Sequence, residues 1–284
     1  MTVGGSADAH ALRSELGTEL GSDVRALAPV GGGDINDAYC ATLADGRRAF
    51  VKANARAPAG LFAAEAAGLA WLACDALRTP GVLGHGDRWL ALEWLDLAGR
   101  PDANAFGRAL AALHHLGAPA FGHGATSFLA TIPLDNTSES DWPTFYVERR
   151  LRPICRAAHL DVDRELDRLR ARPELFGPAE PPARLHGDLW WGNVGAVRGQ
   201  AVIFDPAVYA GHREIDLAML ALFGDLPPAL LDGYQQVTPL ADGWRERLAL
   251  HQLLPLAAHA LLFGGGYGDR VRAGLATITR GSPA

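Results

Sequence analysis

Residues 185–194 read LHGDLWWGNV, and within them His186, Asp188 and Asn193 form the pattern H-x-D-x-x-x-x-N. The catalytic loop of protein kinases has this spacing, with an arginine at the position of Gly187. Phosphoryl transfer to an alcohol requires a carboxylate that orients the hydroxyl and accepts its proton. An asparagine a few residues later can bind magnesium through its carbonyl oxygen. A turn in which Asp188 and Asn193 only bond nearby backbone has the same letters, so this stretch alone leaves both interpretations open.

Three residues outside this stretch supply what a kinase loop needs. Asp205 follows Asn193 by twelve positions, at the end of the apolar run VIFD, and magnesium is commonly held by one or two carboxylates together with substrate phosphates. Lys52 follows a predicted hairpin, and Glu65 lies thirteen residues later in a helical segment, which matches the lysine–glutamate pair of kinases. Each residue alone has an ordinary explanation, namely a turn before Pro206 or a solvated side chain. Their order along the chain favours one phosphoryl-transfer site.

A glycine run upstream is a weaker candidate for phosphate binding. Gly32 and Gly33 lie between two β-rich runs and would allow the backbone to approach phosphates closely. An ordinary hairpin turn explains them equally well. Asp34 follows them, and because its carboxylate would repel phosphates, we expect it to point away from the nucleotide.

The segment 93–95 closes the predicted N-terminal lobe. If it links two lobes, the backbone groups of Glu93, Trp94 and Leu95 would meet the edge of an adenine ring, with apolar neighbours around it. Plain burial of a strand is the alternative, in which the Glu93 side chain has no role.

The pattern of apolar residues divides the chain into two predicted lobes. In residues 1–95, β-rich runs surround one helical segment, and an Asp-Gly turn predicts a hairpin. In residues 96–284, helical periodicity dominates, with one β-rich exception at 183–208. We therefore predict an α+β fold, with a small β-rich N-terminal nucleotide-binding lobe and a larger, mainly helical C-terminal lobe for catalysis and substrate binding. The β-rich runs of the first lobe are 23–30, 38–44, 48–54 and 89–97, and the helical segments of the chain are 60–77, 102–116, 140–158, 161–172, 213–223, 227–237, 241–263 and 268–279.

Composition limits the classes of partner. The chain has 284 residues and a net charge of −6, with 26 basic and 32 acidic residues, which disfavours nucleic acid and anionic membranes as partners. No apolar run approaches 18 residues, and the N-terminus lacks a signal-peptide pattern. The three cysteines are widely spaced, which is typical of reduced thiols rather than of a metal site. We expect a cytoplasmic protein with a small-molecule partner, whose oligomeric state the sequence does not indicate.

Taken together, the motifs resemble those of the fructosamine (ketosamine) kinase family, relatives of the aminoglycoside and choline kinases. The resemblance runs from about Gly31 to near the C-terminus. It is carried by GGGDINDAY, RRAFVKAN, LALEWL, DWPTFYVERRLRP, LHGDLWWGNV and FDPAVYAGHREIDLAML, in the family's order. The wider phosphotransferase group shares only a looser H-G-D-x-x-x-x-N and a later Asp, so HGDLWWGN and DPAVYAGHREIDLAM are the most specific parts.

The resemblance implies a bilobal, protein-kinase-like fold and an enzyme that uses ATP and Mg²⁺. By it, Asp188 would be the catalytic base, Asn193 and Asp205 would hold magnesium, and Lys52, paired with Glu65, would engage the phosphates. The family phosphorylates a sugar hydroxyl of ketosamines, typically the 3-hydroxyl, and the product tends to leave its amine, which is a deglycation repair activity. The implied substrate is a ketosamine on a free amino acid, a small amine or a protein lysine.

Two side chains and two other functions remain open. Trp190 would be a platform for the sugar, but burial statistics favour two buried aromatics, Trp190 and Trp191, that pack the loop. Asp216 would contact substrate or brace the loop by accepting hydrogen bonds from its backbone. A phosphotransferase for an aminoglycoside, choline or another amino alcohol is the alternative enzyme, against which the GHREID segment and the tryptophan-bearing loop argue. A nucleotide-binding pseudoenzyme is the other alternative, against which the intact motif residues argue.

Overall fold

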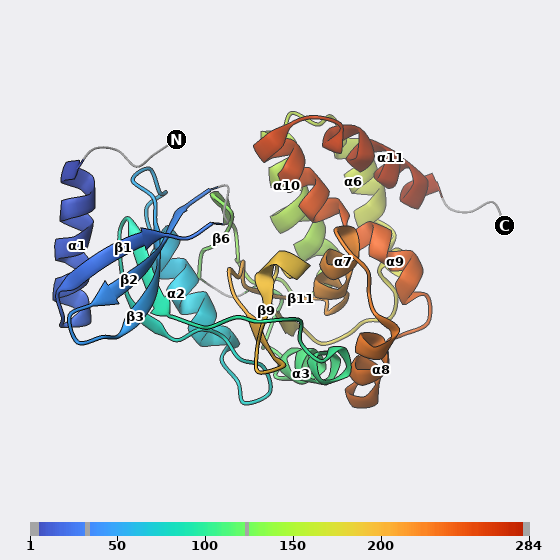
Figure 1. The fold of residues 1–284 in the computed structure, drawn as a ribbon. Coiled ribbons are helices and arrows are strands. Elements are labelled where there is room, and N and C mark those ends of the chain that lie inside the picture. Colours follow the sequence, from blue (N-terminus) through green and yellow to red (C-terminus); the bar gives the residue numbers. More distant parts are fainter. Residues whose placement is uncertain (1–5, 32–34, 123–124, 281–284) are drawn as a thin grey trace.

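The structure, a computed structural model, describes residues 6–31, 35–122 and 125–280. It has two lobes side by side, a sheet flanked by helices and a larger group of helices (Figure 1). This is the predicted α+β, bilobal arrangement. Among the described residues, no helix has both the length and the apolar character that crossing a membrane requires.

The N-terminal sheet has five antiparallel strands, β1 (Val24–Pro29), β2 (Asp37–Leu43), β3 (Arg48–Ala53), β4 (Val82–Gly86) and β5 (Trp89–Glu93). They are hydrogen-bonded in the order β1-β2-β3-β5-β4. The predicted hairpin joins β2 to β3, and Gly46 in its turn has a φ of 87°, which is favourable only for glycine. Lys52 therefore lies on a central strand, between β2 and β5.

A helix covers each face of this sheet (Figure 1). Successive side chains of β5 point to opposite faces: Trp89 packs with α1 (Ser6–Leu20), and Leu90 packs with α2 (Leu61–Leu72). α1 was not expected, although its leucines at positions 12, 16 and 20 recur at helical spacing and pack on the sheet. α2 ends at Leu72 rather than at residue 77, because the chain turns to extended backbone at the next residue.

The C-terminal lobe is mainly helical, as predicted, with two local differences. The segment 241–263 forms two helices rather than one; Pro255 lies in the first turn of the second, where its missing N–H is not needed. The segment 140–158 contains a π-helical turn between two α-helices. The helical elements are α3 (Ala103–His115), α4 (Trp142–Thr144), the π-helical η1 (Phe145–Leu151), α5 (Arg152–Ala157), α6 (Asp163–Arg170), η2 (Pro173–Phe176), α7 (Glu214–Leu222), α8 (Pro228–Val237), α9 (Trp244–His251), α10 (Leu253–Phe263) and α11 (Tyr267–Arg280).

Short strands lie between the sheet and the helices (Figure 1). As the β-rich exception at 183–208 predicted, β8, β9 and β10 form there; β9 pairs with β10, and β8 pairs with β11, which lies just beyond the predicted range. A third pair, β6 with β7, was not expected. The elements are β6 (Ser127–Leu129), β7 (Ile132–Leu134), β8 (Ala183–Leu185), the short turn η3 (Trp191–Asn193), β9 (Val194–Val197), β10 (Gln200–Ile203) and β11 (Tyr209–Gly211).

Candidate active site

The stretch 185–194 forms a loop that leaves β8 and ends in η3. Gly187 has a φ of 81°, and a Cβ there would overlap the carbonyl oxygen of Ala207, so only glycine fits this turn. The turn brings the side chain of Asp188 into a pocket of about 500 Å³ between the lobes. The glycine at the position of the kinase arginine therefore has a conformational cause.

Asp216, in the first turn of α7, holds this loop from behind. Its carboxylate accepts hydrogen bonds from the backbone N–H groups of His186 and Gly187, both at 2.9 Å. It also lies 3.2 Å from Nε2 of His114, whose Nδ1 is 2.7 Å from the Tyr234 hydroxyl. Burial opposes the charge, but the His114 partner and the loop N–H groups lower the pKa of Asp216 below its ordinary value.

The two roles considered for Asp216 are thereby separated. Its side chain is fully buried and lies outside the pocket lining, so the expected contact with substrate is corrected to a positioning role. The expected bracing of the loop is confirmed by the two N–H contacts. His114 on α3 is part of this support.

His186 ties the loop to the segment that carries Asp205. Its Nδ1 accepts from the Asp188 N–H at 3.3 Å, and its Nε2 donates to the Phe204 carbonyl at 2.9 Å. Burial lowers the pKa of His186, so the ring is neutral with the proton on Nε2. The backbone carbonyl of His186 also accepts from the N–H of Ala207 at 2.8 Å. The histidine of the motif is thus a brace between the segments that carry Asp188 and Asp205.

Asp188 lies among other carboxylates. Burial, followed by the charges of Asp205 and Asp216, raises the pKa of Asp188 to about 7. Asn193 donates from Nδ2 to the Asp188 carbonyl at 2.9 Å and to its Oδ2 at 3.4 Å. A carboxylate with a pKa near neutral pH is suited to accept a proton from a substrate hydroxyl.

Lys52 forms salt bridges to both lobes. Its Nζ is 2.6 Å from Oε1 of Glu65 on α2 and 2.7 Å from Oδ1 of Asp205. Burial disfavours the ammonium, but the two carboxylates outweigh burial and raise the pKa of Lys52 above its ordinary value. The pairing with Glu65 that the sequence predicted is therefore present, and the lysine is charged inside the pocket.

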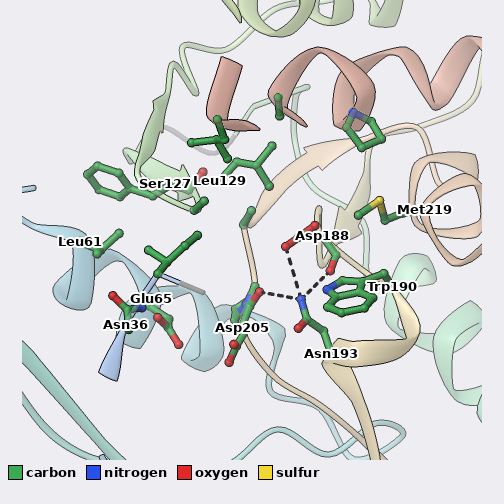
Figure 2. A pocket seen from close by; sticks show the side chains of 18 of the residues that line it. Asn36, Leu61, Glu65, Ser127, Leu129, Asp188, Trp190, Asn193, Asp205 and Met219 are labelled. Carbon is green, nitrogen blue, oxygen red and sulfur yellow. Dashed lines mark hydrogen bonds between the residues drawn. The ribbon is translucent and has the colours of Figure 1, made fainter. Parts of the chain in front are cut away.

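The residues present suit a hard divalent cation. Asp205 and Asn193 both line the pocket, and they offer a carboxylate and an amide oxygen, the ligand types that Mg²⁺ prefers. Because Asn193 uses its Nδ2 for the loop, its Oδ1 remains available, with no donor among the described residues. Figure 2 shows Asp188, Asn193 and Asp205 grouped opposite Glu65.

The two tryptophans of the loop differ in their surroundings. Trp190 is 40% exposed and lines the pocket, so the expectation that this ring is buried is wrong. Trp191 is partly buried and packs against the core beside Phe106, at 6.1 Å between ring centroids, and its indole N–H donates to the Asp225 carbonyl at 3.0 Å. The local sequence could not separate the two, because only the turn η3 decides which ring faces the pocket.

The other predicted nucleotide contacts are not among the described residues that line this pocket. Gly32, Gly33 and Asp34 lie outside the described residues. Glu93 is the last residue of β5, and Trp94 and Leu95 follow it; none of the three lines the pocket. Glu93 pairs with Arg78 at 2.6 Å, and the Trp94 indole N–H donates to Asp96 at 2.9 Å. Their contact with an adenine ring stays a prediction.

Comparison with known proteins gives a consistent result. The family model described as fructosamine kinase matches residues 8–280. A probable ketoamine kinase of Enterococcus faecium is 38% identical over 86% of this chain and 92% of that protein. A probable ketoamine kinase of Synechocystis is 39% identical over 84% of this chain and 85% of that protein.

Solved structures agree with this result. A candidate fructosamine-3-kinase from Thermobifida fusca superposes with a TM-score of 0.84 at 43% identity, over 94% of this chain and 99% of that chain. The aminoglycoside phosphotransferase APH(4)-Ia, solved with ADP and hygromycin B, has a TM-score of 0.61 at 16% identity, over 95% and 98% of the two chains, and shares the fold alone. The fold is that of the protein-kinase-like phosphotransferases, and the chain belongs to the fructosamine kinase family.

Proposed function

We propose that this protein is an ATP- and Mg²⁺-dependent kinase that phosphorylates a sugar hydroxyl of ketosamines, such as the adducts of fructose or ribulose with amines. The observation that carries the proposal is the meeting of Asp188, Asn193 and Asp205 with Lys52 in one pocket. Membership of the family supports a kinase. The names of its relatives, ketoamine kinase and fructosamine-3-kinase, support the substrate class and favour the 3-hydroxyl as acceptor.

The reaction moves the γ-phosphoryl group of ATP to that hydroxyl. Asp188 orients the hydroxyl and accepts its proton while the oxygen forms a bond to phosphorus. The bond from phosphorus to the oxygen that bridges it to ADP breaks, so the products are the phosphorylated ketosamine and ADP. Lys52 supplies positive charge to the phosphates. Mg²⁺ supplies further positive charge when bound, and Asn193 and Asp205 are the residues that would hold it.

The chemistry of the proposed product suggests a biological role for the reaction. A ketosamine with a phosphate on its 3-oxygen tends to leave its amine, so the activity would remove sugars from small amines or protein lysines. The role is then deglycation repair in the cytoplasm.

The test measures ADP formation from ATP with fructosyl-lysine and ribulosyl-lysine, with and without EDTA. We expect Mg²⁺-dependent turnover, and a loss of about 10²- to 10⁴-fold in kcat for Asp188→Asn. Asp232→Asn, on the exposed surface of α8, is the matched control and should leave kcat unchanged. NMR of the product identifies the phosphorylated oxygen.

Three outcomes would contradict the proposal. Turnover by Asp188→Asn at the wild-type rate would remove Asp188 as the base. Turnover of an aminoglycoside or choline without turnover of any ketosamine would assign the other enzyme class. Magnesium-dependent ATP binding without turnover of any acceptor would indicate a pseudoenzyme.

A further inference from the structure

Beyond Asp188, several aromatic side chains line the part of the pocket that the C-terminal lobe forms. Trp190, Phe223 and Phe263 are 40%, 40% and 56% exposed, and all three line the same pocket as Asp188. Exposed large apolar side chains that gather at one place commonly mark a binding surface. Figure 2 shows Trp190 close to Asp188, so the first of these aromatic side chains lies beside the catalytic carboxylate.

The rings form a continuous row that runs from the catalytic loop to α10. Trp190 meets Phe223 edge-on at 6.4 Å, and His259 lies 5.0 Å from Phe223 and 5.4 Å from Phe263, between ring centroids. A sugar hydroxyl held at Asp188 would leave the rest of a substrate to extend along this row. We call these four residues the aromatic wall.

His259 adds one polar atom to the aromatic wall. Its Nδ1 is 2.7 Å from the Pro255 carbonyl on the same helix. A carbonyl can only accept, so Nδ1 carries a proton, and in the tautomer with this single ring proton Nε2 is an acceptor. Nε2 has no hydrogen-bond partner among the residues that the structure describes. The side chain lines the pocket, and its far nitrogen is therefore available to a substrate donor.

The charges of the pocket distinguish ketosamines with a carboxylate beside the substrate nitrogen from ketosamines without one. Among its described lining residues, Lys52 is the only lysine or arginine, and it is already paired with Glu65 and Asp205. A carboxylate next to the substrate nitrogen would find no free cation and would lie near Asp188. An ammonium, in contrast, is attracted by carboxylates and by the faces of aromatic rings.

We propose that the aromatic wall is the subsite for the amine half of the ketosamine. His259 Nε2 accepts a hydrogen bond from the secondary ammonium, and the rings of Trp190, Phe223 and Phe263 cover the carbon chain attached to it. The substrates are then adducts of alkyl or arylalkyl amines, the lysine side chain included, rather than adducts of α-amino groups beside a carboxylate. The inference rests on the proposed ketosamine kinase activity.

The experiment compares the fructose adducts of butylamine and glycine, which share one sugar. We expect kcat/KM of the wild type to be at least about tenfold higher for the butylamine adduct, since the carboxylate of glycine has no partner. Phe263→Ala should narrow this ratio. Val237→Ala, a truncation of an exposed side chain outside the pocket, should preserve it.

His259 is tested separately. His259→Leu removes the acceptor and should raise KM for the butylamine adduct by about tenfold with little change in kcat. His259→Gln offers an amide oxygen and should restore much of the affinity. His115→Gln, at an exposed position of α3 outside the pocket, is the matched control.

The outcomes separate this inference from the proposed function. Equal kcat/KM for the two adducts, or an unchanged KM in His259→Leu, overturns the amine subsite and leaves the ketosamine kinase standing. Absence of turnover of every ketosamine overturns the proposed function and this inference with it.

Discussion

At the residue scale, the support of the loop that carries Asp188 depends on one carboxylate with two accepting oxygens. Asp216 uses Oδ2 for the His186 N–H and Oδ1 for the Gly187 N–H. An asparagine has the same shape but offers only one accepting oxygen. The substitution Asp216→Asn therefore leaves one buried loop N–H without an acceptor. The new amide group beside it donates instead of accepting.

We expect Asp216→Asn to lower the free energy of unfolding by about 1–3 kcal/mol, the cost of one unsatisfied buried donor. Because the loop carries Asp188, kcat should fall clearly while KM for ATP changes little. Urea unfolding and steady-state kinetics measure the two effects, with Asp232→Asn as the exposed control. A variant that loses stability but keeps the wild-type kcat would show that Asp216 has no positioning role.

At the scale of elements, α3 and α8 hold the supports of Asp216 in place. His114 lies on α3 and Tyr234 on α8, and the two side chains are hydrogen-bonded at 2.7 Å. The helices approach closely at Gly107 and Gly233: a Cβ on Gly107 would overlap the Leu230 carbonyl. One on Gly233 would likewise overlap the carbonyl of Asn104. Backbone atoms cannot move aside as a flexible side chain can.

We expect Gly233→Ala to lower the free energy of unfolding by about 1–3 kcal/mol, because the added methyl group forces the two helices apart. Gly17→Ala, in α1, is the matched control; its Cβ would meet only ordinary contacts, so stability should stay the same or rise by up to about 1 kcal/mol. Urea unfolding curves of the two variants decide the matter. Equal stability would mean that the helices separate without cost.

At the scale of the whole molecule, a buried group of charges in the C-terminal lobe links stability to pH. His212, Glu214 and His251 have ligand-type atoms within 4.8 Å of one another. Arg247 occupies both oxygens of Glu214, at 2.6 and 2.9 Å, so this carboxylate is neutralised by the guanidinium. Burial, followed by the charge of His251, lowers the pKa of His212 to about 4.

This shift predicts how stability depends on pH. The unfolded chain binds a proton on His212 near pH 6.5, whereas the folded protein binds it only near pH 4. The contribution of His212 to the free energy of unfolding is therefore fully present above pH 6.5. It is lost as the pH falls toward 4, and the loss reaches up to about 3 kcal/mol. In His212→Asn the fall in the free energy of unfolding below pH 6.5 that His212 causes should disappear. The control variant His115→Asn should keep this fall. Urea unfolding at pH 7, 6 and 5 measures it; identical slopes in wild type and His212→Asn would contradict the assignment.

Much of the candidate site was predictable because its chemistry is carried by local motifs. Asp188 and Asn193 lie five residues apart, and Lys52 and Glu65 lie on a strand and on the helix that follows it, so short-range spacing indicated their meeting. His114 and Tyr234 could not be assigned in this way. His114 contacts Asp216 across 102 positions and Tyr234 across 120 positions of the chain.

The sequence by itself determined the α+β class, the hairpin that carries Lys52, and the loop that carries Asp188, because periodicity, turn residues and short motifs are local properties. Only the tertiary structure decided which loop tryptophan faces the pocket, that Asp216 lies behind the loop, and that His259 and Phe263 lie at the same pocket as Asp188. These outcomes depend on how distant helices pack against the loop. Packing is set by the shapes of all the contacting side chains together, which no short stretch of sequence contains.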